Sequence, residues 1–273
     1  MSEYKKIHGI HIQALASDPS NLGAGQVWYN TTSNQLKITA VSTSGAWATG
    51  GNLGTSRKGL AGAGTQTAGL GFGGMTPSAT TNATEQYDGS AWTAGGNLAT
   101  SRYFLAGAGT QTAGLAFSGD DTSSTTNSTE HYDGSAWTAG GNMATARYKL
   151  AGAGTDTAGL AFGGSPDGGA AEHYDGSAWT TGGNMGSGRY GLGGAGTDTA
   201  GLAFGGNPGA SVTNATEHYD GSAWTSGGNM GTERYYLAGC GTQTAALGSG
   251  GYDSPITNAT EHYDGSAWTA GGN

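Results

Sequence analysis

The 273-residue chain is acidic and sparingly charged, with a formal net charge of −9 and only ten Lys and Arg residues. Binding of nucleic acid or anionic lipid needs a basic patch, which this composition does not supply. No apolar run reaches the length of a membrane span, and the start MSEYKKIHGIHIQALAS lacks the apolar core and cleavage site of a signal peptide. We therefore expect no nucleic-acid partner, no membrane insertion and no classical secretion.

The N-terminal region is expected to be irregular up to about residue 25, because Asp18-Pro19 and Gly23 mark turns. After it, GQVWYNTTSNQLKIT predicts a β-hairpin with strands Val27 to Tyr29 and Gln35 to Thr39. The WYN motif, the polar turn and the Leu-Lys strand resemble N-terminal hairpins of bacteriophage tail and fibre proteins. That resemblance implies a place in a virion or on an extracellular surface.

The rest of the chain consists of five copies of one repeat. The copies are opened by Arg57, Arg102, Arg147, Arg189 and Arg234 and closed by Trp92, Trp137, Trp179, Trp224 and Trp268. The Arg residues are spaced by 45, 45, 42 and 45 positions. A period of this length, with several short runs bounded by turns, is typical of a β-propeller or a solenoid, and we favour the propeller.

Each copy divides into four strand-length runs. In the third copy these are Tyr148 to Gly154, Thr157 to Phe162, Ala171 to Tyr174 and Ser177 to Thr181. Asp175-Gly176, between the last two runs, predicts a two-residue type I′ hairpin loop. Four strands in about 45 residues match one blade of a propeller.

The order of the punctuating residues resembles the kelch repeat. Arg147, the doublet Gly163-Gly164, the pair Tyr174-Asp175 and Trp179 follow that family's order of Arg, Gly-Gly, Tyr and Trp, and the other copies repeat it. Two departures are a short interval between Tyr and Trp and one doublet that reads Ser118-Gly119. The resemblance implies an all-β propeller of four-stranded blades, but it implies no single function, since kelch propellers serve as enzymes, adaptors and recognition modules.

The blade count depends on the segment before the first full copy. Ser44 to Asn52 copies the last strand of a repeat, although the chain has its own last strand at Trp268. We therefore favour six blades, with residues 1–53 contributing the hairpin and the Trp47 strand to the first blade. Residues 54–273 then supply the five copies 54–98, 99–143, 144–185, 186–230 and 231–273 of the same single domain. The alternative is five blades, with residues 1–50 as an appendage.

The copies diverge in two places, the loop after the glycine doublet and the second residue after each Arg. In a kelch-like layout both open on one face of the disc, where functional loops of repeat proteins concentrate. The candidate ligand-binding residues are Phe104, Asp120, Asp121, Lys149, Pro166, Asp167, Asn207, Pro208, Tyr236, Tyr252 and Asp253. Unconstrained drift of exposed loops is the alternative explanation, and aromatic residues argue against it because they are costly on a solvated surface.

The repeated residues are expected to be structural. A ring of His173 and its equivalents could bind a metal, but we favour a structural role, because equivalent residues lie one blade apart and the neighbouring Glu points to the opposite face of the strand. Arg147 and its equivalents are expected to pair with a repeated Glu and with backbone carbonyls. Cys240 takes the place of Ala in the other copies and is interpreted as a small buried residue. We predict no cofactor, no metal and no catalytic residue.

Three functions are compatible with this pattern. The first is a non-enzymatic phage virion or tail propeller that presents variable loops to a host surface glycan or protein. The second is a glycan-acting enzyme that uses the loop carboxylates Asp120, Asp121, Asp167 and Asp253, and the third is a purely structural scaffold. Retaining glycosidase chemistry needs two carboxyl groups about 5–5.5 Å apart, which a sequence does not reveal.

Overall fold

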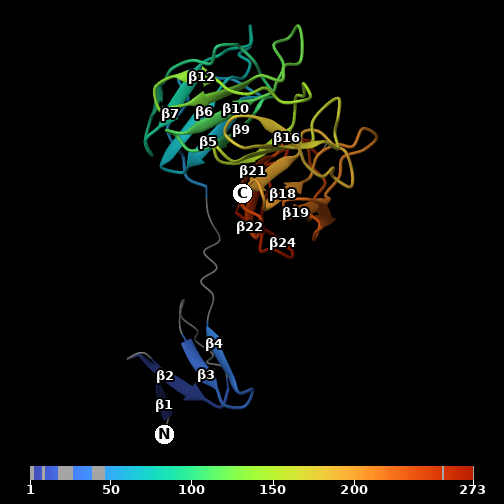
Figure 1. The fold of residues 1–273 in the computed structure, drawn as a ribbon. Coiled ribbons are helices and arrows are strands. Elements are labelled where there is room, and N and C mark those ends of the chain that lie inside the picture. The colour runs from blue at the N-terminus through green and yellow to red at the C-terminus, as the bar shows by residue number, and fades with distance from the viewer. Residues whose placement is uncertain (1–2, 8–9, 18–26, 39–46, 254, 273) are drawn as a thin grey trace. The chain divides into compact units, whose positions relative to one another are not determined.

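The structure is a computed structural model that describes residues 3–7, 10–17, 27–38, 47–253 and 255–272. The chain divides into two compact units, Met1–Gly45 and Ala46–Asn273 (Figure 1). Within the described ranges, no helix is long and apolar enough to cross a membrane.

The N-terminal unit is a four-stranded sheet in the order β1-β2-β3-β4. Its strands are β1 (Glu3–Ile7), β2 (Ile10–Leu15), β3 (Val27–Asn30) and β4 (Gln35–Ile38). The predicted β3-β4 hairpin is confirmed, and the Asn30 side chain accepts hydrogen bonds from the amides of Thr32 and Ser33 in its turn, both at 3.0 Å. The expectation of an irregular start is wrong for residues 3–7 and 10–15, because β1 and β2 pair there and the run IHIQAL alternates apolar and polar residues as a strand does. The expected turns at Asp18-Pro19 and Gly23 lie outside the described residues.

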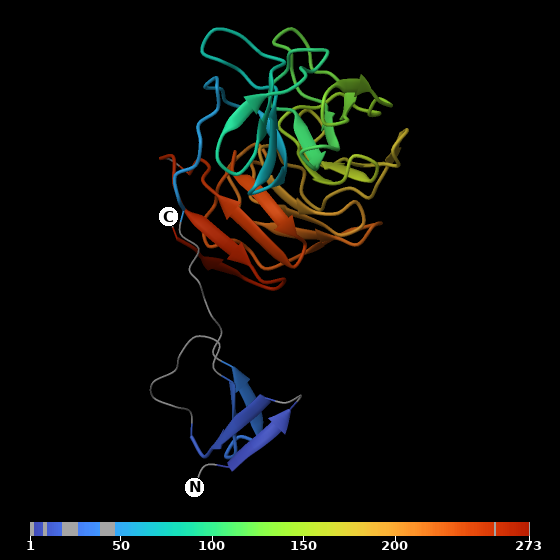
Figure 2. The ribbon, with the colours of Figure 1, turned by 90° about the vertical axis from the view of Figure 1, so that its left-hand side faces the viewer.

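The second unit is a β-propeller of five four-stranded antiparallel blades (Figures 1 and 2). Blade 1 contains β5 (Ala61–Thr65), β6 (Ala68–Phe72), β7 (Thr84–Tyr87) and β8 (Trp92–Ala94). Blade 2 contains β9 (Ala106–Gly109), β10 (Gly114–Phe117), β11 (Thr129–Tyr132) and β12 (Trp137–Ala139). Blade 3 contains β13 (Ala151–Gly154), β14 (Gly159–Phe162), β15 (Ala171–Tyr174) and β16 (Trp179–Thr181).

Blade 4 contains β17 (Gly193–Gly196), β18 (Gly201–Phe204), β19 (Thr216–Tyr219) and β20 (Trp224–Ser226). Blade 5 contains β21 (Ala238–Thr242), β22 (Ala245–Ser249), β23 (Thr260–Tyr263) and β24 (Trp268–Ala270). The favoured count of six blades is therefore wrong. The β3-β4 hairpin is not a blade strand pair, because β3 pairs in parallel with β2 of the N-terminal sheet instead.

The loop between the third and fourth strands of a blade differs from the predicted type I′ turn. In blade 3 the ladder ends at the Tyr174–Trp179 pair, and of the loop residues only Gly176 has a positive φ, of 93°. The Asp175 carboxylate accepts hydrogen bonds from the amides of Ser177 and Ala178, both at 2.8 Å. These bonds lower the pKa of Asp175, and the loop is a four-residue turn held by a side chain.

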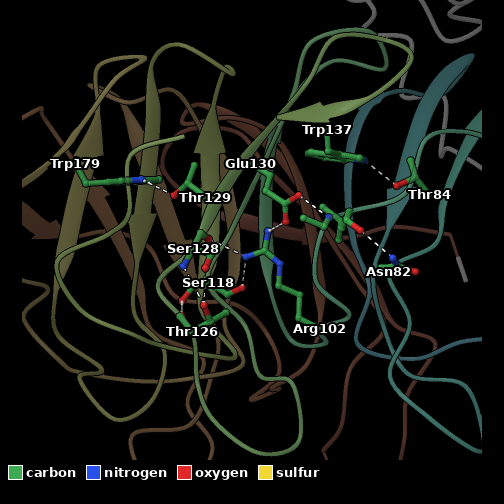
Figure 3. A network of polar contacts seen from close by, with 12 residues as sticks. Asn82, Thr84, Arg102, Ser118, Thr126, Ser128, Thr129, Glu130, Trp137 and Trp179 are labelled. Atoms are coloured by element: carbon green, nitrogen blue, oxygen red, sulfur yellow. Dashed lines mark hydrogen bonds and ion pairs between the residues drawn. The ribbon is translucent and has the colours of Figure 1, made fainter. Parts of the chain in front are cut away.

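A buried Arg-Glu pair ties the strands of each blade together, as Figure 3 shows for blade 2. Arg102 Nη2 lies 2.9 Å from Glu130 Oε1, and Arg102 Nη1 donates to the carbonyls of Ser118 and Ser128 at 2.9 and 2.7 Å. The second Glu130 oxygen accepts the amide of Ala99 at 2.7 Å. The predicted pairing of the repeated Arg with a repeated Glu and with backbone carbonyls is thus confirmed, and all partners belong to the same blade.

Neighbouring blades meet through aromatic and small residues. Phe72 of blade 1 lies edge-on to Trp137 of blade 2, with ring centroids 4.9 Å apart, and Trp137 Nε1 donates to Thr84 at 2.9 Å (Figure 3). Phe72 also approaches Gly107 so closely that an added Cβ would lie 2.5 Å from the ring. Glycine in the inner strands therefore serves blade packing, which offsets the conformational entropy that it costs.

The prediction that Cys240 is buried is wrong. Cys240 is exposed, whereas its equivalents Ala108, Ala153 and Ala195 are only 4–6% exposed. All five residues of its strand β21 are exposed, while the inner strands of blades 2, 3 and 4 alternate buried and half-buried residues. The difference reflects what lies beside the strand and not the residue itself.

Candidate functional site

The second residue after each Arg forms a continuous element at one end of the inner strands. Gly59, Phe104, Lys149, Gly191 and Tyr236 all have a positive φ, between 51° and 63°. Their backbones are joined in sequence by hydrogen bonds: the amide of Phe104 donates to Gly59, Lys149 to Phe104, Gly191 to Lys149 and Tyr236 to Gly191, at 2.6–2.8 Å. We call these five residues the axial collar.

The collar side chains converge over the two collar glycines. Phe104 covers Gly59, and Tyr236 covers Gly191, since a Cβ on either glycine would lie 3.1 Å from the ring above it. The rings of Phe104 and Tyr236 stack on each other, with centroids 5.4 Å apart and an interplanar angle of 17°. Residues from blades 2 and 5 thus form one aromatic surface.

Lys149 places its ammonium among four aromatic rings. Its Nζ lies 5.2 Å from the Phe104 centroid, 5.1 Å from Tyr148, 5.3 Å from Tyr190 and 5.2 Å from Tyr236. Partial burial opposes the charge, but the phenol groups of Tyr236, Tyr148 and Tyr190 outweigh it and raise the pKa of Lys149. The site therefore holds a fixed positive charge, stabilised by cation–π contacts.

A cavity lies behind the collar. It has a volume of about 290 Å³ and is lined by the collar residues and by leucines that follow them, such as Leu105, Leu150 and Leu192. The inner strands of all five blades line a second cavity of about 450 Å³. The collar is thus the mouth of a channel between the inner strands.

The divergent loops lie beside the collar. The first residue of each loop pairs with the residue that precedes a collar position, as Asp120 does with Tyr103, Ser165 with Tyr148, Asn207 with Tyr190 and Tyr252 with Tyr235. The two divergent sets are therefore adjacent on one face, as expected.

The four loop carboxylates do not share one environment. The Asp120 carboxylate accepts a hydrogen bond from the Thr122 amide at 2.7 Å, and that of Asp121 accepts those of Ser124 and Ser123 at 2.7 and 2.8 Å, which lowers the pKa of Asp121. Asp167 acts electrostatically on the buried Arg147 of its own blade, and Asp253 belongs to the loop of blade 5.

The remaining candidate residues lie in the divergent loops beside the collar. Pro166, Asn207 and Pro208 line a separate groove of about 240 Å³ between the loops of blades 3 and 4. Tyr252 is 40% exposed and stands edge-on to Tyr235, with centroids 5.5 Å apart. Of the predicted set, the structure brings together Phe104, Lys149 and Tyr236.

Two collar partners were missed by sequence reasoning. Tyr148 and Tyr190 complete the rings around Lys149, but they belong to the repeated frame, since four of the five copies have Tyr after the Arg. Divergence did not select these tyrosines, and the one signal in the sequence was that each of them precedes a divergent position.

The repeated His residues bridge blades. His131 Nε2 contacts the Tyr174 hydroxyl at 2.6 Å, and His173 contacts that of Tyr219 at 2.5 Å. Among the residues that the structure describes, no group of three His, Cys, Asp or Glu side chains is arranged to hold a metal ion. No protein-family model and no curated protein sequence matches the chain.

Proposed function

We propose that the propeller is a non-enzymatic binding module of a phage virion or tail, in which the axial collar binds a glycan on a host surface. The resemblance of the β3-β4 hairpin to N-terminal hairpins of phage tail and fibre proteins supports the virion assignment. The adjacent divergent loops would add contacts around the collar.

One observation carries the proposal: three bulky residues occupy a backbone conformation that the repeat otherwise gives to glycine. Phe104, Lys149 and Tyr236 have φ values of 51°, 58° and 54°, where Gly59 and Gly191 stand in the other copies. A non-glycine residue in this region costs about 1–3 kcal/mol and usually persists at a functional site. Drift without selection would favour glycine here.

The chemistry of the collar suits a sugar. The exposed edge of the Phe104–Tyr236 stack offers an apolar face on which a pyranose ring packs. The Lys149 ammonium, already charged and held in place, donates hydrogen bonds to hydroxyl or carboxylate oxygens beside that ring. A cationic ligand is disfavoured, because the protein's own cation already occupies the aromatic cage.

The test replaces the collar residues by the residue that the repeat itself uses there. The variant Phe104→Gly/Lys149→Gly/Tyr236→Gly should still fold, because Gly59 and Gly191 hold the same positive-φ positions in the other copies. On a glycan array, the parent should bind a defined set of sugars and the variant should lose that binding. Tyr252→Ser is the matched comparison, since it removes an exposed aromatic residue of the blade 5 loop outside the collar, and it should weaken the binding far less than the triple variant does.

Two results contradict the proposal. If the triple glycine variant binds the same glycans as well as the parent does, the collar is not the site. If the parent releases shortened glycans during the assay, the protein is an enzyme, and the carboxylates of the divergent loops become the residues to test.

A further inference from the structure

The five blades form four interfaces instead of the five that a closed ring would have. The inner strands pack side by side from β5 to β9, β13, β17 and β21, but β21 and β5 do not pack on each other in this way. Among the described residues there are four inter-blade hydrophobic cores, and each joins consecutive blades between blade 1 and blade 5. We call the side between blades 5 and 1 the open seam.

Blade 1 presents empty sockets to the open seam. In blade 2, Gly107 and Gly114 receive Phe72 and Leu70 of the preceding blade, whereas every close neighbour of the equivalent Gly62 and Gly69 belongs to blade 1 itself. Polar groups show the same loss: Gln111 donates to the carbonyls of Gly69 and Tyr87 of blade 1, at 3.3 and 2.6 Å. The equivalent Gln66 is exposed and has no hydrogen-bond partner in the described part of the chain.

Blade 5 presents the complementary unpaired groups. The Gln86–Tyr132, His131–Tyr174, His173–Tyr219 and His218–Tyr263 contacts join consecutive blades at 2.5–2.7 Å. By this pattern His262 should contact a Tyr of a next blade, but its side chain is exposed and lacks a partner within the ranges described. At the other side, no His of the described ranges contacts the Tyr87 hydroxyl.

The axial collar is open at the same place. Four amide hydrogen bonds join its five members in order, and none among the described residues joins Gly59 to Tyr236. The Gly59 amide and the Tyr236 carbonyl are therefore the free ends of the series. Both ends face the position that a further blade would fill.

Trp47 already occupies part of that position. In consecutive blades the Trp of one blade donates to the Thr of the blade before it, as Trp137 does to Thr84 and Trp268 to Thr216. Trp47 Nε1 donates in the same way to Thr260 of blade 5, at 3.0 Å. Trp47 therefore stands where the outermost strand of a sixth blade would lie.

The linker after Trp47 repeats the normal connection to the next blade. Gly51 lies against the Ser90 carbonyl of blade 1, as Gly96 lies against Ser135 of blade 2, so that a Cβ would be 2.4 and 2.1 Å away. The segment from Trp47 to Gly51 thus contacts blade 5 on one side of the open seam and blade 1 on the other. Among the described residues, no strands fill the three positions inside this segment.

We propose that the open seam is a docking site for a three-stranded polypeptide segment of this chain's own repeat type, which completes a sixth blade with the Trp47 segment as its fourth strand. Such a segment carries an Ala-Gly inner strand, a second strand with Leu and Phe, and a third strand ending in Glu-His-Tyr. Its Thr accepts from Trp92 Nε1, its His contacts the Tyr87 hydroxyl, and its Tyr contacts His262. These are the contacts already made at the four existing interfaces.

Continuity with the four existing interfaces favours this occupant over a second copy of the chain. Every blade strand of a second molecule is already paired within its own sheet, so that molecule has no free three-stranded segment to insert. The strands β1 to β4 are also unsuitable, because none of their sequences, EYKKI, IHIQAL, VWYN and QLKI, contains the Glu-His-Tyr or the Leu and Phe of the repeat. The proposal does not depend on the proposed glycan binding.

The test supplies the segment to the full chain and follows the thiol of Cys240, the one cysteine of the sequence. A peptide with the sequence of residues 98–134 is added in trans, and in a second form the same sequence is joined after Asn273. Because the segment would cover β21, labelling of Cys240 by a maleimide should slow by about tenfold or more. The melting temperature of the joined form should rise by several degrees.

Two matched variants test whether the segment makes the expected contacts with blades 1 and 5. A segment with Phe117→Asp cannot place its ring on Trp92 and should protect Cys240 much less. His262→Ala in the full chain removes a contact that is unused without the segment, so it should leave the melting temperature of the parent unchanged and weaken segment binding.

Three outcomes overturn the proposal. In the first, Cys240 of the joined form is labelled as fast as in the parent and the two proteins melt at the same temperature. This result rules out docking even if the free peptide is insoluble. In the second, the Phe117→Asp segment protects Cys240 equally well. In the third, the parent alone is a dimer whose Cys240 is already protected, so that a second copy covers the seam.

Discussion

Arg147 shows how a residue that the chain repeats in every blade is used. Its guanidinium donates to the carbonyls of Gly163 and Ala170 at 2.9 and 2.7 Å and pairs with Glu172 at 2.8 Å. Burial lowers the pKa of Arg147, and the charge and hydrogen bond of Glu172 oppose that effect. One planar group thus joins the end of the second strand, the start of the third strand and the segment before the first.

Removing this guanidinium should destabilise the protein strongly. Arg147→Ala leaves the Glu172 carboxylate buried without its counter-ion and two carbonyls without their donor, which costs about 3–5 kcal/mol. For a domain of this size, that lowers the melting temperature by roughly 10 °C, as measured by circular dichroism or calorimetry.

A double variant tests whether the lost stability comes from the unpaired Glu172 charge or from the lost side-chain volume. Arg147→Met/Glu172→Leu removes both charges and keeps much of the volume, so it should recover part of the stability that Arg147→Ala loses. An Arg147→Ala variant that melts at the parent temperature contradicts the structural role of the repeated Arg.

At the scale of whole blades, stability depends on contacts that recur from one interface to the next. The Trp-to-Thr hydrogen bond recurs at three of the four interfaces, and the interface between blades 3 and 4 lacks it. There, Ala171 replaces the Thr, and Trp224 Nε1 is buried with no hydrogen-bond partner among the described residues. The aromatic contact itself is kept, with Phe162 and Trp224 centroids 5.0 Å apart.

Restoring the hydroxyl should therefore stabilise the protein. Ala171→Thr supplies an acceptor to a buried donor, and leaving such a donor unsatisfied costs about 1–3 kcal/mol. The melting temperature should rise by about 2–4 °C for each kcal/mol gained.

Ala171→Val is the control for size, because valine has the shape of threonine without its hydroxyl. If the two variants melt at the same temperature, the gain comes from packing and the missing hydrogen bond is not a defect of this interface.

The elements also show which features a sequence predicts. The strands of the third copy were placed to within a few residues, because the runs between glycine and aspartate turns are short and repeated. The strands β1 and β2 were missed, and the β3-β4 hairpin was assigned to the ring. Its true partner, β2, pairs with β3 in parallel and is set by tertiary contacts that local patterns do not contain.

For the whole molecule, the sequence showed the extra outer-strand segment at Trp47 but did not show that the ring of blades is open beside it. The resemblance of the Trp47 segment to an outer strand is visible in the sequence, and the structure gives it that contact through Thr260. The number of blades was nonetheless wrong, because a segment can lie in the fourth-strand position without three strands inside it. The site was predicted in part for a related reason: divergence identifies Phe104, Lys149 and Tyr236, but not the repeated tyrosines that hold the Lys149 ammonium.

The incomplete collar and the docking site both depend on the open arc of five blades. The most direct measurement is the rate at which a maleimide labels Cys240 in the parent protein, compared with Ala195→Cys in a Cys240→Ala background. Ala195 is the equivalent residue in blade 4 and is only 4% exposed, whereas Cys240 is exposed. Partial burial raises the pKa of Cys240 and slows its reaction, but the reagent can reach it, so we predict that the cysteine at position 195 is labelled at least about tenfold more slowly than Cys240. Equal and slow labelling at both positions would contradict the open seam.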